Sequence, residues 1–101
     1  MQDISVETLK ARLDNGELFH LIDVRETWEY EESNIGAINI PLSGLMNSLP
    51  ELEEWKDEEI IIHCRSGSRS LQAAALLEQM GFKDVKNVPG GIEAWKARFP
   101  L

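Results

Sequence analysis

The residues with the clearest chemical potential lie in one short segment, residues 63–70, which reads His-Cys-Arg-Ser-Gly-Ser-Arg-Ser. Cys64 is the only cysteine of the chain, and it follows a run of three isoleucines, 60–62. A cysteine at the carboxyl end of a buried strand, followed by a glycine-containing loop and a helix, faces backbone N–H groups that favour an anion. The nearest anion is the thiolate itself. The pattern therefore predicts a Cys64 thiol with a lowered pKa that is nucleophilic near neutral pH.

The rest of this loop is predicted to bind a small anionic substrate through backbone N–H groups and arginine side chains. The predicted binding residues are Arg65, Ser66, Gly67, Ser68, Arg69 and Ser70. Each arginine has an alternative use in an ion pair with the acidic surface, and the serines have one in turns. For Ser70 we favour helix capping. Cys64 could instead be an ordinary buried core residue, as free cysteines often are. The six residues that follow it, Arg-Ser-Gly-Ser-Arg-Ser, argue against an apolar environment.

Two further polar residues, Asp23 and Arg25, end another apolar run, residues 18–24. Parallel strands end at the same edge of a sheet, so these residues are expected to support the site, paired with each other or with the loop arginines. His20 and His63 lie in apolar strand runs and are expected to be core or edge histidines rather than an acid or base. One cysteine with two histidines falls short of a structural zinc set. We expect neither a metal nor an organic cofactor.

The elements that must position these residues alternate between strands and helices. Apolar runs predict strands at 18–24, 37–41, 59–63 and 85–88. Helical spacing or capping predicts helices after Ser5, over 26–33, over 43–49 and 51–56 with a break at Pro50, after the loop 64–70, and after Pro89-Gly90-Gly91. This alternation predicts a single α/β domain over residues 1–101, with a parallel sheet covered on both faces.

Charge excludes one class of function. The net charge is −8, whereas nucleic-acid binding draws on a basic surface. The basic residues are nevertheless unevenly distributed: residues 61–101 hold 6 basic and 3 acidic side chains, against 4 and 15 in residues 1–60. This excess around the cysteine is consistent with a small-anion site. No apolar run approaches the roughly 20 residues of a membrane span, and no export signal opens the sequence, so we expect a cytoplasmic protein without a membrane partner.

Four segments together resemble the single-domain rhodanese-like sulfurtransferases. They are LIDVRETWEY (21–30), AINIPL (37–42), HCRSGSRS (63–70) and GFKDVKNVPGGIEAWK (81–96). The resemblance implies a five-stranded parallel sheet with helices on both faces, and a cysteine that carries sulfane sulfur as a persulfide. The sequence departs from the family at 34–37, where Asn-Ile-Gly-Ala replaces the frequent His-Ile-Pro-Gly-Ala. That departure leaves the cysteine loop unchanged.

The expected function is sulfur transfer by double displacement. Cys64 would take sulfur from thiosulfate or a related donor and pass it to cyanide in an assay, or to a thiol or sulfur-carrier protein in the cell. Arg65 or Arg69 would bind the sulfonate end of the donor. One alternative is a cysteine phosphatase or arsenate reductase, whose loop is one residue longer than the four residues between Cys64 and Arg69. The other is a catalytically silent rhodanese-like binding module.

Overall fold

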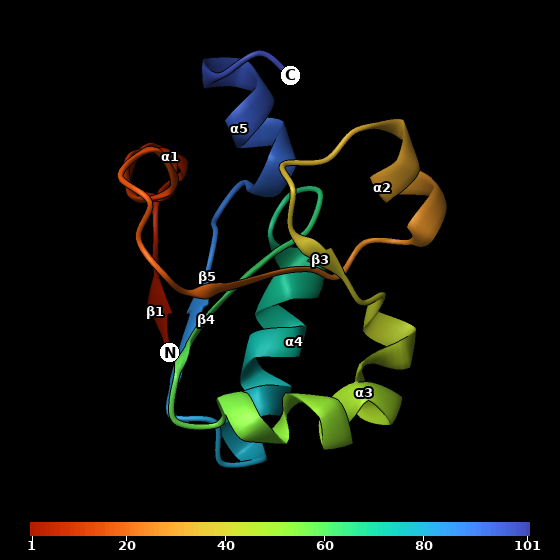
Figure 1. The fold of residues 1–101 in the computed structure, drawn as a ribbon. Coiled ribbons are helices and arrows are strands. Elements are labelled where there is room, and N and C mark those ends of the chain that lie inside the picture. The colour runs from red at the N-terminus through yellow and green to blue at the C-terminus, as the bar shows by residue number, and fades with distance from the viewer.

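The computed structural model describes residues 1–101 and arranges five strands in one parallel sheet of order β1-β5-β4-β2-β3 (Figure 1). The strands are β1 (Gln2–Asp3), β2 (His20–Asp23), β3 (Ile38–Asn39), β4 (Glu59–His63) and β5 (Asp84–Asn87). The helices are α1 (Val6–Asp14), α2 (Thr27–Glu32), α3 (Leu45–Leu52), α4 (Ser68–Gln79) and α5 (Gly91–Arg98). Short 3₁₀ turns, η1 (Leu42–Gly44) and η2 (Glu53–Trp55), flank α3. The fold is therefore α/β with the five-stranded sheet that the resemblance implied.

The central strand β4 is buried on both faces, and its three isoleucines divide between two cores. Ile60 and Ile62 pack with α3 and α4 through residues such as Leu45 and Leu77. Ile61 packs on the other face with α1 and α5, for example against Leu9. Figure 1 shows α1 and α5 on one side of the sheet and α4 on the other. Burial on both faces explains why this strand is an unbroken apolar run rather than an alternating one.

The register of the central strands brings three polar residues to one edge. Asp23 of β2 pairs with His63 of β4, and Asn87 of β5 pairs with Ile62 of β4. Cys64 comes directly after β4, so it begins its loop at this edge. The carboxyl ends of parallel strands are where open α/β sheets bind ligands, and the candidate site lies there.

The expected helix break at Pro50 is wrong. Pro50 lies inside α3, which runs unbroken from Leu45 to Leu52. Both of these end residues are buried in the core, and Leu49 packs against it. Burial of this apolar face outweighs the single helical hydrogen bond that a proline cannot donate.

Other boundaries differ by a few residues. The expected strand 18–24 shortens to β2, and the expected loop 64–70 gives way to α4 from Ser68 onward. At the other end of α4, Gly81 has φ +93°, and the N–H of Phe82 donates to the Leu77 carbonyl at 3.0 Å. This is the Schellman ending expected at Gly81. None of the helices is both long and apolar enough to cross a lipid bilayer.

Candidate active site

The Cys64 sulfur lies inside a ring of hydrogen-bond donors. Its Sγ accepts from the N–H of Gly67 at 3.1 Å and from the N–H of Ser70 at 3.4 Å, and the Ser70 hydroxyl oxygen is 3.4 Å away. Only 1% of the residue is exposed. The loop can curl round the sulfur because Gly67, which precedes α4, adopts φ +112°, a conformation that other residues rarely take. The sulfur thus faces donors from both the loop and the first turn of the helix.

This ring changes the ionisation of the thiol. Burial raises the pKa of Cys64, but hydrogen bonds from the Ser70 hydroxyl and from the backbone N–H groups of Ser70, Gly67 and Ser66 outweigh it, so the pKa is lowered overall. Donors directed at a sulfur stabilise its charged form. The arrangement therefore favours a thiolate.

The final helix orients the loop that surrounds the sulfur. The N–H groups of Ile92 and Glu93 donate to the carbonyls of Cys64 and Arg65, at 2.9 and 3.0 Å. In a trans peptide the C=O and the following N–H point in opposite directions. Holding the Arg65 carbonyl against α5 therefore turns the Ser66 N–H the other way, toward Sγ. Gly91 makes this approach possible, because a Cβ there would lie 2.3 Å from the Cys64 carbonyl oxygen.

The two loop arginines have different environments. Arg69 forms a two-pronged ion pair with Glu29 of α2, at 2.6 and 2.9 Å, and this pair lowers the pKa of Glu29 to about 2. Arg65 is 67% exposed, with its Nε 3.5 Å from a carboxylate oxygen of Glu93. Arg69 thus makes an ion pair with an acidic residue, the alternative to substrate binding that the sequence left open, whereas Arg65 faces solvent.

Asp23 and Arg25 pair with each other beside this edge of the sheet. The buried Arg25 donates to both carboxylate oxygens of Asp23, at 2.7 to 3.1 Å, and its Nη2 also donates to the carbonyl of Ser33 at 2.8 Å. Its Nη1 contacts the Glu29 carbonyl at 3.3 Å. The pair therefore ties the end of β2 to α2, and neither side chain hydrogen-bonds to the Cys64 sulfur.

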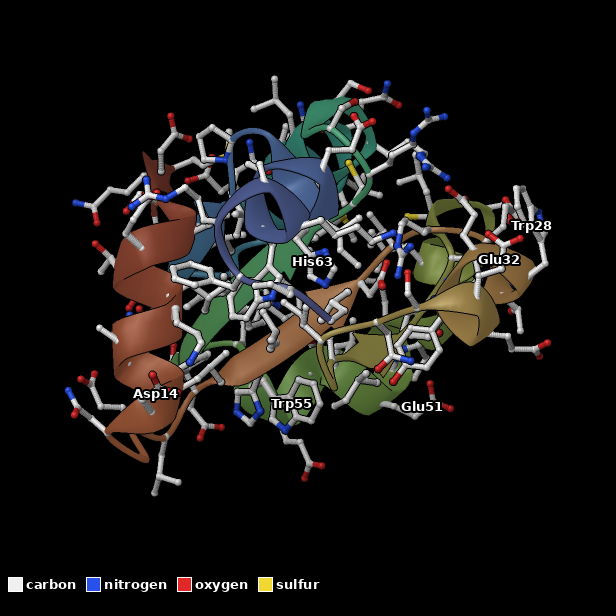
Figure 2. All side chains as sticks on the ribbon, turned by 90° about the horizontal axis from the view of Figure 1, so that it is seen from above. Asp14, Trp28, Glu32, Glu51, Trp55 and His63 are labelled. Carbon is white, nitrogen blue, oxygen red and sulfur yellow. The ribbon has the colours of Figure 1, made fainter.

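Neither histidine is placed for acid–base chemistry on the sulfur. His63 lies near the middle of the molecule beneath α5 (Figure 2), with Nδ1 3.3 Å from the Cys64 carbonyl oxygen and Nε2 3.7 Å from Asp23. Burial lowers the pKa of His63, which favours the neutral ring. His20 stacks on Trp55 at 3.9 Å between ring centroids, toward the other end of β4. No group of three histidine, cysteine or carboxylate side chains is arranged to hold a metal ion.

The serines of the loop also differ in placement. Ser66 and Ser68 are exposed, and Ser68 begins α4. The expectation that Ser70 caps the helix is wrong, because Gly67 occupies the capping position. Ser70 is instead buried in the first turn, where its hydroxyl contacts both Cys64 and Asn87. Because the helix begins before Ser70 rather than after it, the Ser70 hydroxyl lies inside the first turn and close to the sulfur.

A cleft of about 290 Å³ opens beside the loop between α2 and α5. Trp28 and Glu32 of α2, Arg65 of the loop and Lys96 of α5 are among its lining residues. Figure 2 shows Trp28 and Glu32 together at the outer edge of the molecule. The cleft meets the cysteine loop at Arg65, and Cys64 itself is not among its lining residues.

The sequence analysis missed two residues of the site, Glu29 and Asn87. Glu29 lies in the acidic segment 26–33, where no feature distinguished it from its neighbours. Asn87 lies one residue before the end of the predicted strand 85–88, and the argument that placed Asp23 at the ligand edge applies equally to it. Position at a strand end was therefore a usable signal for Asn87.

Comparisons with known proteins identify the family of the chain. Residues 5–98 match the family model of the Rhodanese-like domain, and the chain belongs to that family. A protein of Allochromatium vinosum named "Sulfurtransferase" is 38% identical over 96 residues, covering 94% of this chain and 88% of that protein. The human single-domain sulfurtransferase TSTD1 is 27% identical, with a TM-score of 0.85 and 97% of each chain covered.

A longer relative is similar over part of its length. YrkF of Bacillus subtilis, named as a candidate sulfur carrier protein, is 40% identical over 97 residues. The match covers 95% of this chain but 51% of YrkF, so the chain spans about half of that relative. Rhodanese-like domains of this size therefore occur both as most of a protein and as one part of a larger one.

Proposed function

We propose that this protein is a thiosulfate-type sulfurtransferase that carries sulfane sulfur on Cys64. The observation that carries the proposal is the set of polar groups around Sγ: the N–H groups of Gly67 and Ser70 donate to it, and the Ser70 hydroxyl oxygen lies 3.4 Å away. Donors of this kind favour the thiolate, which is the nucleophilic form of a cysteine. The sulfurtransferase names of the relatives of similar length support the same chemistry.

In the first step the Cys64 thiolate attacks the outer sulfur of thiosulfate. A bond forms between Sγ and that sulfur while the bond from the outer sulfur to the sulfonate breaks, and sulfite leaves with the electron pair. The product is a Cys64 persulfide whose negative charge lies on the terminal sulfur. The N–H groups of residues 65–70 hold this charge as the donors of an oxyanion hole do. The transfer needs neither a metal nor an organic cofactor.

In the second step a nucleophile takes the terminal sulfur and releases the Cys64 thiolate. Cyanide does so in an assay and leaves as thiocyanate, whereas a thiol or a sulfur-carrier protein accepts the sulfur in the cytoplasm. Splitting the transfer into two displacements is covalent catalysis. The cleft between α2 and α5 supplies the approach for donor and acceptor.

In this proposal the other residues of the site either bind the sulfur donor or support the loop that holds Cys64. Arg65 steers the sulfonate of the donor, since its guanidinium is exposed beside the cleft. Arg69 holds the loop against α2 through Glu29 and adds positive charge near the sulfur. Asp23 and Arg25 brace the neighbouring strand end.

A phosphatase or arsenate reductase is less well supported. Arg69 is the arginine that would bind the oxyanion in such an enzyme, and here both prongs of its guanidinium are engaged by Glu29. The four-residue spacing between Cys64 and Arg69 also makes a tighter loop. A silent binding module would have no need for a buried thiolate surrounded by donors.

Intact mass spectrometry after treatment with thiosulfate tests the proposal. We expect the wild type to gain the mass of one sulfur atom, to lose it on addition of cyanide, and to release thiocyanate. Cys64→Ser should gain nothing, because a serine hydroxyl cannot carry sulfane sulfur. A wild type that gains no sulfur, or a Cys64→Ser variant that gains it equally, would show that the mechanism is wrong.

A further inference from the structure

Asn87 is a buried polar residue beside the site that the proposed mechanism does not use. It ends β5, is 5% exposed, and pairs in register with Ile62 of β4, near the start of the cysteine loop. Its Oδ1 accepts a hydrogen bond from the Ser70 hydroxyl at 2.5 Å. Because no hydrogen bond joins it to Cys64 directly, Asn87 reaches the sulfur only through Ser70.

The Ser70 hydroxyl has one proton and three neighbours that can accept it. They are Asn87 Oδ1 at 2.5 Å, the Gly67 carbonyl oxygen at 3.1 Å and Cys64 Sγ at 3.4 Å. The Gly67 carbonyl can only accept. The amide of Asn87 differs, because rotation by half a turn presents its NH₂ group, a donor, in place of its oxygen. The orientation of this amide therefore decides where the Ser70 proton points.

We propose that Asn87 is a positioning residue that acts through Ser70. Its amide orientation sets whether the Ser70 hydroxyl donates to the Cys64 sulfur, according to whether that sulfur is charged. With its amide oxygen toward Ser70, the hydroxyl donates to Asn87 and Sγ keeps only backbone donors. That state suits an uncharged Sγ, as in the thiol or as the inner sulfur of the persulfide. With its NH₂ group toward Ser70, Asn87 donates to the hydroxyl, which donates to the thiolate.

We call the hydrogen-bonded chain Asn87–Ser70–Cys64 the relay. Its response to a persulfide rests on the proposed function, whereas its response to the thiolate depends only on the geometry. As sulfur is loaded, charge moves from Sγ to the terminal sulfur, and the hydroxyl proton is released from Sγ. As sulfur is delivered, the proton returns to it. No heavy atom has to move except those of the Asn87 amide, so the loop can keep one backbone shape through both steps.

The charged groups near the sulfur are either paired or exposed to solvent, and none of them hydrogen-bonds to Sγ. Arg69 of α4 is paired with Glu29 of α2, Arg65 lies near Glu93 of α5, and Asp23 of β2 is paired with Arg25. His63 of β4 is the remaining titratable neighbour, and burial lowers its pKa. The hydrogen bonds from Asn87 through Ser70 to Cys64 can therefore reverse their donor and acceptor roles without moving a charged group.

A double-mutant cycle tests the relay with the full chain and no sulfur donor. The rate at which iodoacetamide alkylates Cys64 is measured against pH for the wild type, Asn87→Leu, Ser70→Ala and the double variant. Leucine is similar in size to asparagine but neither donates nor accepts. We expect Asn87→Leu to slow alkylation about fivefold at pH values below the midpoint, since no amide then donates to the hydroxyl and the Gly67 carbonyl competes with the thiolate for its proton. In the Ser70→Ala background the same substitution should have no effect.

Asn87→Asp provides a second variant of the same shape, which keeps the proposal testable if Asn87→Leu fails to fold in a thermal melt. An aspartate can only accept, so it should raise the midpoint, and by more when Ser70 is present than in the Ser70→Ala background. Equal shifts in both backgrounds, or no shift in folded Asn87→Leu, would overturn the relay. Since alkylation needs no donor, such a failure leaves the proposed function standing. A wild type that gains no sulfur would defeat that function without affecting the alkylation result.

Discussion

Arg69 and Glu29 join the first turn of α4 to α2 through two parallel hydrogen bonds, Nη1–Oε1 at 2.6 Å and Nη2–Oε2 at 2.9 Å. Arg69 is 30% exposed and Glu29 is 12% exposed, so water screens the pair only in part. The hydrogen bonds from Arg69 are the main reason that the pKa of Glu29 falls to about 2.

This pair should make stability depend on pH in the acid range. The folded-state pKa of Glu29 is depressed, so its contribution is present above the ordinary value of 4.5 and is lost as the pH falls toward about 2. We expect Glu29→Gln to lower the free energy of unfolding at pH 7 by about 1 to 2 kcal/mol, after allowance for solvent screening. Urea titrations at several pH values measure this. Glu31→Gln, an exposed neighbour on α2, is the control, and an equal loss in both variants would contradict the assignment.

The Cys64 thiol should ionise below the free value of about 8.5. The midpoint of alkylation rate against pH measures this directly. Ser70→Ala should raise the midpoint, because it removes the hydroxyl donor 3.4 Å from Sγ. Ser43→Ala, at an exposed position near the start of α3, should leave it unchanged. A wild-type midpoint at or above the free value would mean that the N–H groups do not stabilise the sulfur.

Substitution of Arg65 should change KM for thiosulfate, whereas substitution of Arg69 should change the melting temperature. Arg65→Ala should raise KM for thiosulfate about fivefold with little change in Tm, because its guanidinium is exposed and, in the proposed function, steers the donor. Arg69→Ala should lower Tm, because it breaks the pair with Glu29. Steady-state assays on both variants, with Lys83→Ala as the control for loss of one surface charge, decide this. An unchanged KM in Arg65→Ala would show that donor binding does not use this side chain.

Gly91→Ala should destabilise the protein by roughly 3 kcal/mol, through steric overlap and a strained backbone. Its Cβ would lie 2.3 Å from the Cys64 carbonyl oxygen, and φ is +52°. Gly44→Ala is a matched control, because nothing lies within 4 Å of its Cβ position and its φ is −101°. That variant should stay within about 0.5 kcal/mol of the wild type. Denaturant unfolding compares the two, and similar losses would mean that close approach of α5 to the loop does not matter.

Loop length should select between sulfur and oxyanion chemistry. The wild type should turn over thiosulfate and show negligible hydrolysis of an aryl phosphate. A glycine inserted between Gly67 and Ser68 should lower sulfur transfer and allow phosphate or arsenate to bind, since it redirects the N–H groups. Both activities and the inhibition constants of the anions are measured on the two proteins. Substantial phosphatase activity in the wild type would favour the phosphatase alternative.

The central strands of the fold were predictable because burial on both faces leaves a plain pattern, as in residues 60–62. β1 was not predictable from its residues. Gln2 and Asp3 are exposed and polar, and they form a strand only because β5 offers an unpaired edge. The path of α3 through Pro50 likewise depends on a core that no local pattern reveals.

The site was predictable to the level of the loop and no further. A cysteine after an isoleucine run, followed by serines, glycine and arginines, indicated the loop that forms the candidate site. The partners of the loop come from distant elements, with Glu29 from α2 and Asn87 from β5. Such contacts are set by the packing of helices on the sheet, so a single sequence indicates the candidates but not the pairs.

The contact of Ile92 and Glu93 with the carbonyls of Cys64 and Arg65 also makes the cysteine loop depend on the last helix of the chain. If α5 moved away, these two carbonyls would lose the N–H groups that hold them, and the Ser66 N–H would be free to turn away from the sulfur. A local opening of α5 should therefore return Cys64 toward the reactivity of an ordinary thiol. Docking of the final helix and activation of the cysteine are in this sense one and the same folding event.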